Sequence, residues 1–310
     1  MSFEGMPGHD LINVVRDLEP VAAVRDQEAA ERRRAYPGLA GAGAAEFGCA
    51  EQAGGAWRIL SLGAPSPGAA RAALAGHLRG AAGEHDPPEA GEMLRLADAL
   101  EDSPGDGRGG PDRNEWTAGP LRFRVVRVQG FARFGDDGPE PARVTDSEEG
   151  PPPDPRIDPA APVGPSDAAL RRELLGRAPH LEPVPEEERR EAAAAIEAYP
   201  GVVLLPPYFS VMEDRDGLWR PVGRGGSPQQ ARDALAHYFR VLTPRDAPPG
   251  CPPPSPGELA EYARAADRID ADGGIEFMAC GRRFRIVRVI RMVRVGPDGP
   301  EPARPSDEDG

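Results

Sequence analysis

The chain has 310 residues, a formal net charge of −14, and 38 residues each of Gly and Pro. It contains no lysine, so arginine is the only basic residue apart from histidine. This excludes a phosphate-binding loop built on lysine, a lysine Schiff base and a lysine general base. The acidic balance argues against coating nucleic acid by bulk attraction, and the length is enough for two ordinary domains.

The composition also indicates where the chain works. No run of about 18 apolar residues occurs, and the N-terminal sequence lacks a basic leader followed by an apolar core. The three cysteines, Cys49, Cys251 and Cys280, form no CxxC pair, which is typical of a reducing compartment. We therefore expect a cytoplasmic protein that does not bind membranes.

In chain order, the pattern first predicts an Arg- and Glu-rich helix over 21–34 that ends at the AYPG sequence at 35–38. Two short strands follow, and the second carries Trp57. Ser66 and Pro67 are typical of a helix start, with Ser as N-cap and Pro at the first helical position. A second helix, a short strand near Trp116 and a long strand from Phe123 to a DGP turn complete this first stretch.

The same series then occurs a second time. AYPG recurs at 198–201, and SPGAARAALAGHLR at 66–79 matches SPQQARDALAHYFR at 227–240 at 8 of 14 positions. RFGDDGPEPAR at 133–143 matches RVGPDGPEPAR at 294–304 at 9 of 11 positions. Several matches in one order indicate an internal duplication.

We therefore predict an α+β fold of two tandem duplicated domains, each a small, mostly antiparallel sheet with two or three helices. A pseudo-two-fold relation between the two sheets is left open. The predicted divisions are an N-terminal segment at 1–20, a first repeat domain at 21–147, a Pro-rich linker at 148–166, a connecting helix and loop at 167–184, and a second repeat domain at 185–310.

The FRIVRV strand at 284–289 and the following GPDGPEPARPSD at 296–307 resemble an uncharacterised family of high-GC actinobacteria, described as a domain of unknown function. The resemblance implies a bacterial protein and no known activity. No functional residue is carried over from it.

The long strands hold the leading candidate residues. Arg288 and Arg294 lie in an otherwise apolar row of the second strand, and Arg127 and Arg133 lie in the matching row of the first. A half-buried guanidinium needs an anionic partner. One interpretation is an internal ion pair with a carboxylate on the neighbouring strand, for which the matched candidates are Glu115 and Glu276. The other is a pair of arginine-lined pockets for a small anion or an acidic partner.

Other patterns are weaker. Trp57 and Trp219 are candidates for stacking on a ligand, although they also suit the two cores. The glycine-rich turn at 223–227 precedes a helix, where a phosphate could bind, but the pattern favours an ordinary capping turn. The histidines show no metal-ligand spacing, and no catalytic grouping stands out. We expect no metal, no cofactor and no assigned catalytic residue.

The sequence therefore favours a non-catalytic interaction or ligand-binding protein whose contacts are Arg127, Arg133, Arg288, Arg294, Trp57 and Trp219. Its expected partner is an unknown protein or a small anionic ligand. An enzyme acting on an anionic small molecule is the alternative. Nucleic-acid binding is a further alternative, which is not expected because it would need the arginine strands exposed as a local basic stripe. The sequence does not indicate an oligomeric state.

Overall fold

The computed structural model describes residues 5–101, 114–148, 156–177, 185–243 and 253–307. Cys251 and residues 149–155 of the predicted linker at 148–166 therefore lie outside the described residues. The α+β class is confirmed, because helices pack around one open antiparallel sheet of twelve strands.

The sheet strands differ greatly in length. In chain order they are β1 (Gly38–Gly41), β2 (Glu46–Ala53), β3 (Ala56–Ala64), β4 (Glu115–Ala118), β5 (Leu121–Gly135), β6 (Gly138–Pro139), β7 (Arg156–Ile157), β8 (Gly201–Arg215), β9 (Leu218–Gly225), β10 (Glu276–Ala279), β11 (Arg282–Gly296) and β12 (Gly299–Pro300). Their spatial order is β7-β3-β2-β5-β11-β8-β9, and the short strands β1, β4 and β6 pair with β5 while β10 and β12 pair with β11.

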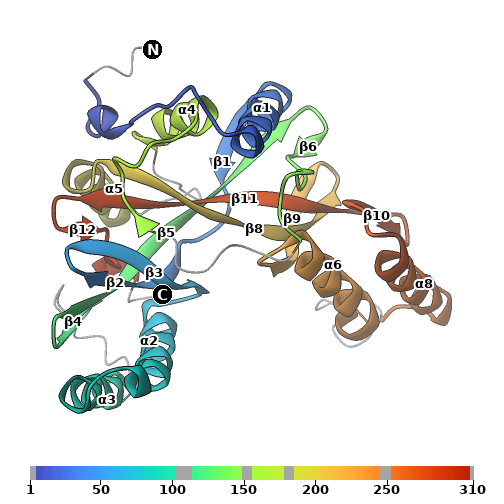
Figure 1. Ribbon diagram of the computed structural model, residues 1–310. Helices are drawn as coiled ribbons and strands as arrows, with labels where there is room; N and C mark the ends of the chain where they lie inside the picture. Colours follow the sequence, from blue (N-terminus) through green and yellow to red (C-terminus); the bar gives the residue numbers. More distant parts are fainter. Residues whose placement is uncertain (1–4, 102–113, 149–155, 178–184, 244–252, 308–310) are drawn as a thin grey trace.

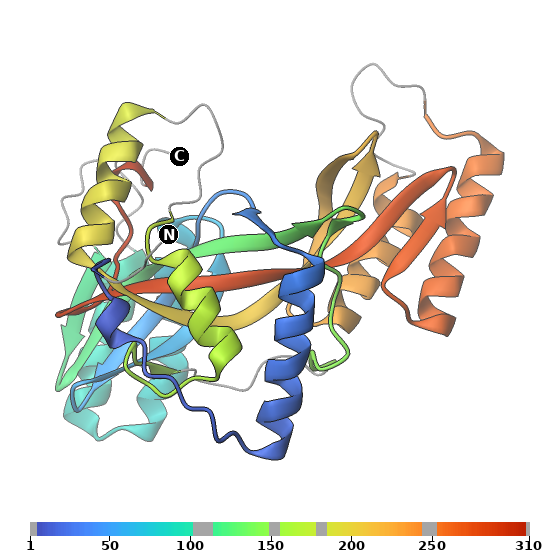
Figure 2. The ribbon, with the colours of Figure 1, turned by 90° about the horizontal axis from the view of Figure 1, so that it is seen from above.

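The helices lie in separate groups around the sheet (Figures 1 and 2). They are α1 (Pro20–Ala35), α2 (Pro67–Ala81), α3 (Pro87–Glu101), α4 (Pro165–Leu174), α5 (Glu186–Ala198), α6 (Pro228–His237) with its continuation η4 (Tyr238–Leu242), and α8 (Pro256–Asp272), besides the short turns η1 (His9–Leu11), η2 (Ala82–Glu84) and η5 (Pro305–Asp307). The pair α2/α3 and the pair α6/α8 lie at opposite ends of the molecule (Figure 1).

The predicted helix starts are present. The side-chain oxygen of Ser66 accepts a hydrogen bond from the backbone N–H of Ala69, and that of Ser227 accepts one from Gln230. Leu74 and Leu78 of α2, and Leu235 and Phe239 after the second start, are buried in two separate apolar cores. Burial of one helix face against the sheet thus follows from the i, i+4 apolar spacing.

The expectation of two tandem domains is not supported, because the strands of both stretches belong to a single sheet. The long strands β5 and β11 pair with each other at its centre, with Gly130 opposite Arg291 (Figure 1). Ile290 and Met292 of β11 and Phe131 of β5 form a shared core under Leu170 and Leu174 of α4. The backbone pairing and this core join the two stretches.

Candidate functional site

Beyond their central pairing, β5 and β11 diverge, and the segment after each DGP turn enters the gap between them. On one side the backbone N–H of Glu140 donates to the carbonyl of Arg133, and the N–H of Arg288 donates to the carbonyl of Glu140. On the other side the backbone N–H of Glu301 donates to the carbonyl of Arg294, and the N–H of Arg127 donates to the carbonyl of Glu301. The four arginines predicted from the sequence therefore flank two buried glutamates.

Each segment then supplies an aspartate to the arginine of the opposite stretch. Nε of Arg288 lies 3.0 Å from Oδ1 of Asp146, and Nε of Arg127 lies 3.0 Å from Oδ2 of Asp307. We call Arg133, Glu140, Arg143, Asp146 and Arg288 the open cluster, and Arg294, Glu301, Arg304, Asp307 and Arg127 the closed cluster.

The ion pairs expected between these arginines and Glu115 or Glu276 are not formed. Strand β10 pairs with β11 in a register that places Glu276 opposite Arg285, three residues before Arg288. Glu276 accordingly pairs with Arg285 and Arg283, and Glu115 pairs with Arg124 and Arg122. The need for an internal anionic partner was predicted correctly for Arg127 and Arg288. The partner, however, comes from the segment after the DGP turn of the other half, which we call the exchanged segment.

Trp57 and Trp219 lie beside these outer pairs. The guanidinium carbon of Arg124 is 5.0 Å from the Trp57 ring centroid, and that of Arg285 is 5.0 Å from the Trp219 ring. Each indole also packs on the glycine of the opposite DGP turn, Gly299 for Trp57 and Gly138 for Trp219. A side chain at either glycine would collide with the indole, so Trp and turn hold each other.

Arg133 and Arg294 are bound from α4. Arg133 pairs with Glu173 at 2.8 Å, and Nη2 of Arg294 donates to the carbonyls of Leu174, Leu175 and Arg177 at the end of the helix. The negative end of a helix dipole favours a cation there. Burial nevertheless lowers the pKa of Arg294 to about 10.

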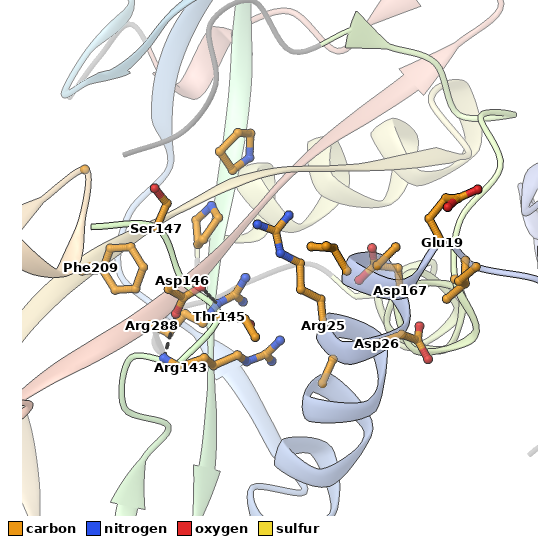
Figure 3. A pocket seen from close by; sticks show the side chains of 18 residues that line it. Glu19, Arg25, Asp26, Arg143, Thr145, Asp146, Ser147, Asp167, Phe209 and Arg288 are labelled. Carbon is orange, nitrogen blue, oxygen red and sulfur yellow. Dashed lines mark hydrogen bonds and ion pairs between the residues drawn. The ribbon is translucent and has the colours of Figure 1, made fainter. Parts of the chain in front are cut away.

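The described residues contain a cavity of about 610 Å³ next to the open cluster. It lies between α1, the start of α4, the segment 143–147 and β8 (Figure 3). Its apolar wall includes Val21, Pro206, Pro207 and Phe209. Its charged lining consists of Glu19, Arg25, Asp26, Arg143, Asp146, Asp167 and Arg288.

Four of these charged groups are already held by the protein. Asp26 accepts hydrogen bonds from the backbone N–H and the hydroxyl of Ser166, which ties α1 to the start of α4. Arg288 uses Nε for Asp146, and Arg143 uses Nε for Glu140 at 2.7 Å. Within the described part of the chain, the terminal nitrogens of both guanidinium groups make no hydrogen bond, so they remain available toward the cavity.

Arg25 differs from them because it is exposed on α1 and has no ion pair within the described ranges. Its side chain extends from the helix into the cavity, on the side facing Arg143 and Arg288 (Figure 3). Its guanidinium contributes a positive field to this wall of the cavity, where the carboxylates of Glu19 and Asp26 also lie.

Asp167 opposes that field from the first turn of α4. Although solvent in the cavity reaches it, the surrounding protein raises the pKa of its carboxyl, and Asp26 acts in the same direction. The charges of Arg288, Arg171 and Arg143 counteract part of this rise. Asp167 is the carboxyl in the cavity whose pKa the structure moves upward, and its charge is therefore sensitive to what binds nearby.

The corresponding place beside the closed cluster is different. In the sequence repeat, Arg25 of α1 corresponds to Glu188 of α5, and α4 has no counterpart. Both helices are nevertheless held in the same way to the segment after the DGP turn of their own half. The hydroxyl of Thr145 donates to Glu28 of α1, and the hydroxyl of Ser306 donates to Glu191 of α5. The arginine-lined cavity thus occurs on one side of a repeated framework.

Arg25, Arg143 and Asp167 were not among the residues singled out from the sequence. Arg143 was visible within the repeated PEPAR sequence, but Arg25 looked like an ordinary surface residue of a charged helix. The glycine-rich turn reaches the cavity only through Gly226, whose N–H already donates to Gln230. No metal-binding group of His, Cys, Asp and Glu occurs among the described residues.

The strand arginines are buried or half-buried in the sheet and form no exposed basic stripe. Among the helices that the structure describes, none is long and apolar enough to cross a membrane. The chain belongs to DUF5954, a family of unknown function, which it matches over residues 19–310. No curated protein and no solved structure matches it.

Proposed function

We propose that this DUF5954 chain binds a small anionic molecule in the cavity between α1 and the segment 143–147. The observation that carries the proposal is Arg25, a guanidinium that extends into the cavity without an ion-pair partner in the described residues. Arg143 and Arg288 add terminal N–H donors across the same space. A guanidinium matches the geometry of carboxylate and phosphate with two parallel hydrogen bonds.

The cavity has the size and lining of a small-molecule site. Its volume of about 610 Å³ falls within the range of known ligand pockets, roughly 300–1,000 Å³. Val21, Pro206, Pro207 and Phe209 supply an apolar wall opposite the charged groups. These features favour a ligand with an anionic group and an apolar portion over a bare ion.

We also infer that the chain arose by duplication and that its halves are related by a pseudo-two-fold axis near Gly130 and Arg291. These two positions correspond in the sequence repeat and lie opposite each other in the β5–β11 pairing. The matched pairs Arg288–Asp146 and Arg127–Asp307 support the inference. After duplication, one copy can retain the framework while the other acquires a binding site, which agrees with Arg25 and Glu188 at corresponding positions.

A non-catalytic role fits the paired state of most charged groups in the cavity. An enzyme acting on the bound anion is the second candidate, and the raised pKa of Asp167 is the observation in its favour. A carboxyl that holds its proton closer to neutral pH can act as a general acid or base. Slow conversion of a bound ligand would distinguish this candidate from simple binding.

The test compares Arg25→Gln with Arg34→Gln, a matched control on the exposed end of the same helix outside the cavity. Calorimetric titration with inorganic phosphate, sulfate and phenyl phosphate should give weaker binding for Arg25→Gln by about tenfold to a hundredfold, because one charged hydrogen-bonding group contributes roughly 1.5–3 kcal/mol. Arg34→Gln should bind like the unaltered protein.

Native mass spectrometry of the protein purified from its own cells identifies any retained small molecule, which then replaces the probes. Equal affinities for Arg25→Gln and Arg34→Gln would contradict the proposal. So would ligand density away from the cavity in a crystal of the phenyl phosphate complex.

A further inference from the structure

The closed cluster contains more buried donors than its acceptors can satisfy. Nη1 of Arg127, Nη2 of Arg304 and Nη1 of Arg294 are shielded from solvent and have no hydrogen-bond partner among the described residues, and neither has the acceptor Oε2 of Glu301. A buried donor without a partner costs about 1–3 kcal/mol, and more when it is charged. Three such donors in one place require an explanation.

These groups belong to one electrostatic unit. Asp307 accepts from Nε of Arg127 and from the backbone N–H of Arg304, and Glu301 accepts from Nε of Arg304. The charges of Arg304 and Arg127 both act to lower the pKa of Arg294, whereas Glu301 acts to raise it. Within the described part of the chain, three guanidinium groups thus share two carboxylates, which leaves an excess of one positive charge.

The carbonyls at the end of α4 offset part of that excess, but they engage only Nη2 of Arg294. A water can donate to Oε2 of Glu301 and accept hydrogen bonds from two guanidinium groups, so buried waters can satisfy the donors. A water carries no net charge, however. Water alone therefore leaves the excess positive charge of the cluster in place.

The open cluster provides an internal comparison. There the unpartnered buried atoms are one donor, Nη1 of Arg133, and one acceptor, Oε2 of Glu140. A single water can satisfy both. The terminal nitrogens of Arg143 and Arg288 are absent from that buried set, because they line the cavity. The excess of buried donors is a property of the closed cluster.

We propose that the closed cluster holds a small inorganic anion of halide size, bound by Arg127 and Arg304 and balanced by the charge of Arg294. The donors are shielded from solvent, so the occupant has to fit inside the protein without reaching the surface. An anion accepts several hydrogen bonds at once and neutralises the excess charge, whereas a water does only the former. This site is structural and is independent of ligand binding in the cavity.

Crystals of the full chain grown in sodium bromide test the site directly. We expect an anomalous bromine peak within hydrogen-bonding distance of Nη1 of Arg127 and Nη2 of Arg304. A water at that position, or no bromine peak there in a crystal whose surface sites are occupied by bromide, would overturn the proposal.

A solution measurement compares an arginine of the closed cluster with a surface arginine outside both anion sites. The thermal unfolding midpoint of the protein should rise by roughly 2–4 °C once bromide exceeds its dissociation constant about tenfold, at constant ionic strength set with gluconate. Arg304→Gln should lose this rise, and Arg34→Gln, on the exposed end of α1, should keep it. Equal bromide dependence of the two variants would contradict the site, whatever their absolute stabilities.

Discussion

At the scale of single residues, the molecule shows how arginine serves every strongly basic role in a chain without lysine. Arg288 forms an ion pair with Asp146, Arg294 binds the carbonyls at the end of α4, and Arg124 stacks on Trp57. All three uses exploit the planar, delocalised guanidinium, which a lysine ammonium would not reproduce.

The charge of Asp167 should control anion binding in the cavity. Because its folded-state pKa is raised, an ionised Asp167 repels an anion at high pH, and protonation removes that repulsion as the pH falls through this pKa. Sulfate affinity, measured by calorimetry as the pH is lowered from neutral to about pH 4, should therefore increase toward low pH. Asp167→Asn should bind sulfate tightly throughout and lose most of the pH dependence.

The groups facing Asp167 set the control for this experiment. Arg288, Arg171, Arg143 and Asp26 all act on its carboxyl, and the arginines remain charged in this pH range. Asp270→Asn, on the exposed surface of α8, is the matched variant and should keep the pH dependence of the unaltered protein. An identical pH profile for Asp167→Asn and the unaltered protein would assign the effect to another group.

Sequence reasoning reached some of these residue roles and not others. The apolar rows of the long strands were enough to demand anionic partners for Arg127 and Arg288. They could not identify Asp307 and Asp146, because each aspartate belongs to the other half of the chain, more than 140 residues from its arginine. The nearer carboxylates, Glu115 and Glu276, were taken up by arginines at adjacent positions of the same strands.

At the scale of elements, the two exchanged segments, 137–146 and 298–307, form the main contacts between the two halves. Asp298 binds Arg122 and Arg124, and Arg124 also donates to the carbonyl of Pro300. Asp137 and Pro139 do the same for Arg283 and Arg285. Each half is therefore completed by about ten residues of the other.

Arg124 and Asp298, which pair across the two halves, should contribute different amounts to the free energy of unfolding. Arg124 is 4% exposed, so Arg124→Met leaves Glu115 without its buried partner and should lower the free energy of unfolding by about 3 kcal/mol. The carboxylate of Asp298 is 69% exposed, so Asp298→Asn should cost about 1 kcal/mol or less. Urea unfolding measures both, and equal losses would contradict this assignment.

The ion pairs of Asp298 also predict how the stability of the protein depends on pH under acidic conditions. Hydrogen bonds from Arg122 and then Arg124 hold the pKa of Asp298 far below its ordinary value. A depressed folded-state pKa stabilises the fold above the unfolded-state value, about 3.9, and this stabilisation is lost as the pH falls below it. Asp298→Asn should therefore lose stability relative to the unaltered protein at neutral pH, and this difference should shrink below about pH 4.

Helix α4 shows that a sequence pattern can predict a helix without predicting what the helix packs against. A connecting helix and loop were predicted over 167–184, and the helix is observed at Pro165–Leu174. Nothing local showed that Leu170 and Leu174 cover the junction of β5 and β11, since that junction forms only when distant strands pair.

At the scale of the whole molecule, the sheet and the exchanged segments should make unfolding a single cooperative event. Leu78→Ala in the core under α2 and Leu235→Ala in the core under α6 remove fully buried side chains in different halves. Each should cost about 2–5 kcal/mol and shift the same calorimetric transition. Two separable transitions, one displaced by each variant, would contradict the shared fold.

The repeat in the sequence predicted the order of helices and strands in each half but placed the halves apart. Chain order alone favours tandem domains, because consecutive elements are usually neighbours in space. The central pairing of β5 with β11 joins residues about 160 positions apart in the chain, and no local pattern encodes such a contact. The outcome is one sheet in which neither half has its own boundary.

The exchange of segments has a consequence for how the protein is made. The first half contains Arg124, Arg127 and Trp57 at positions whose partners, Asp298, Asp307 and Gly299, are synthesised more than 170 residues later. Early domains normally fold while synthesis continues. Here these side chains of the first half gain their partners only after residue 307 has left the ribosome, so the first half should complete its folding together with the second.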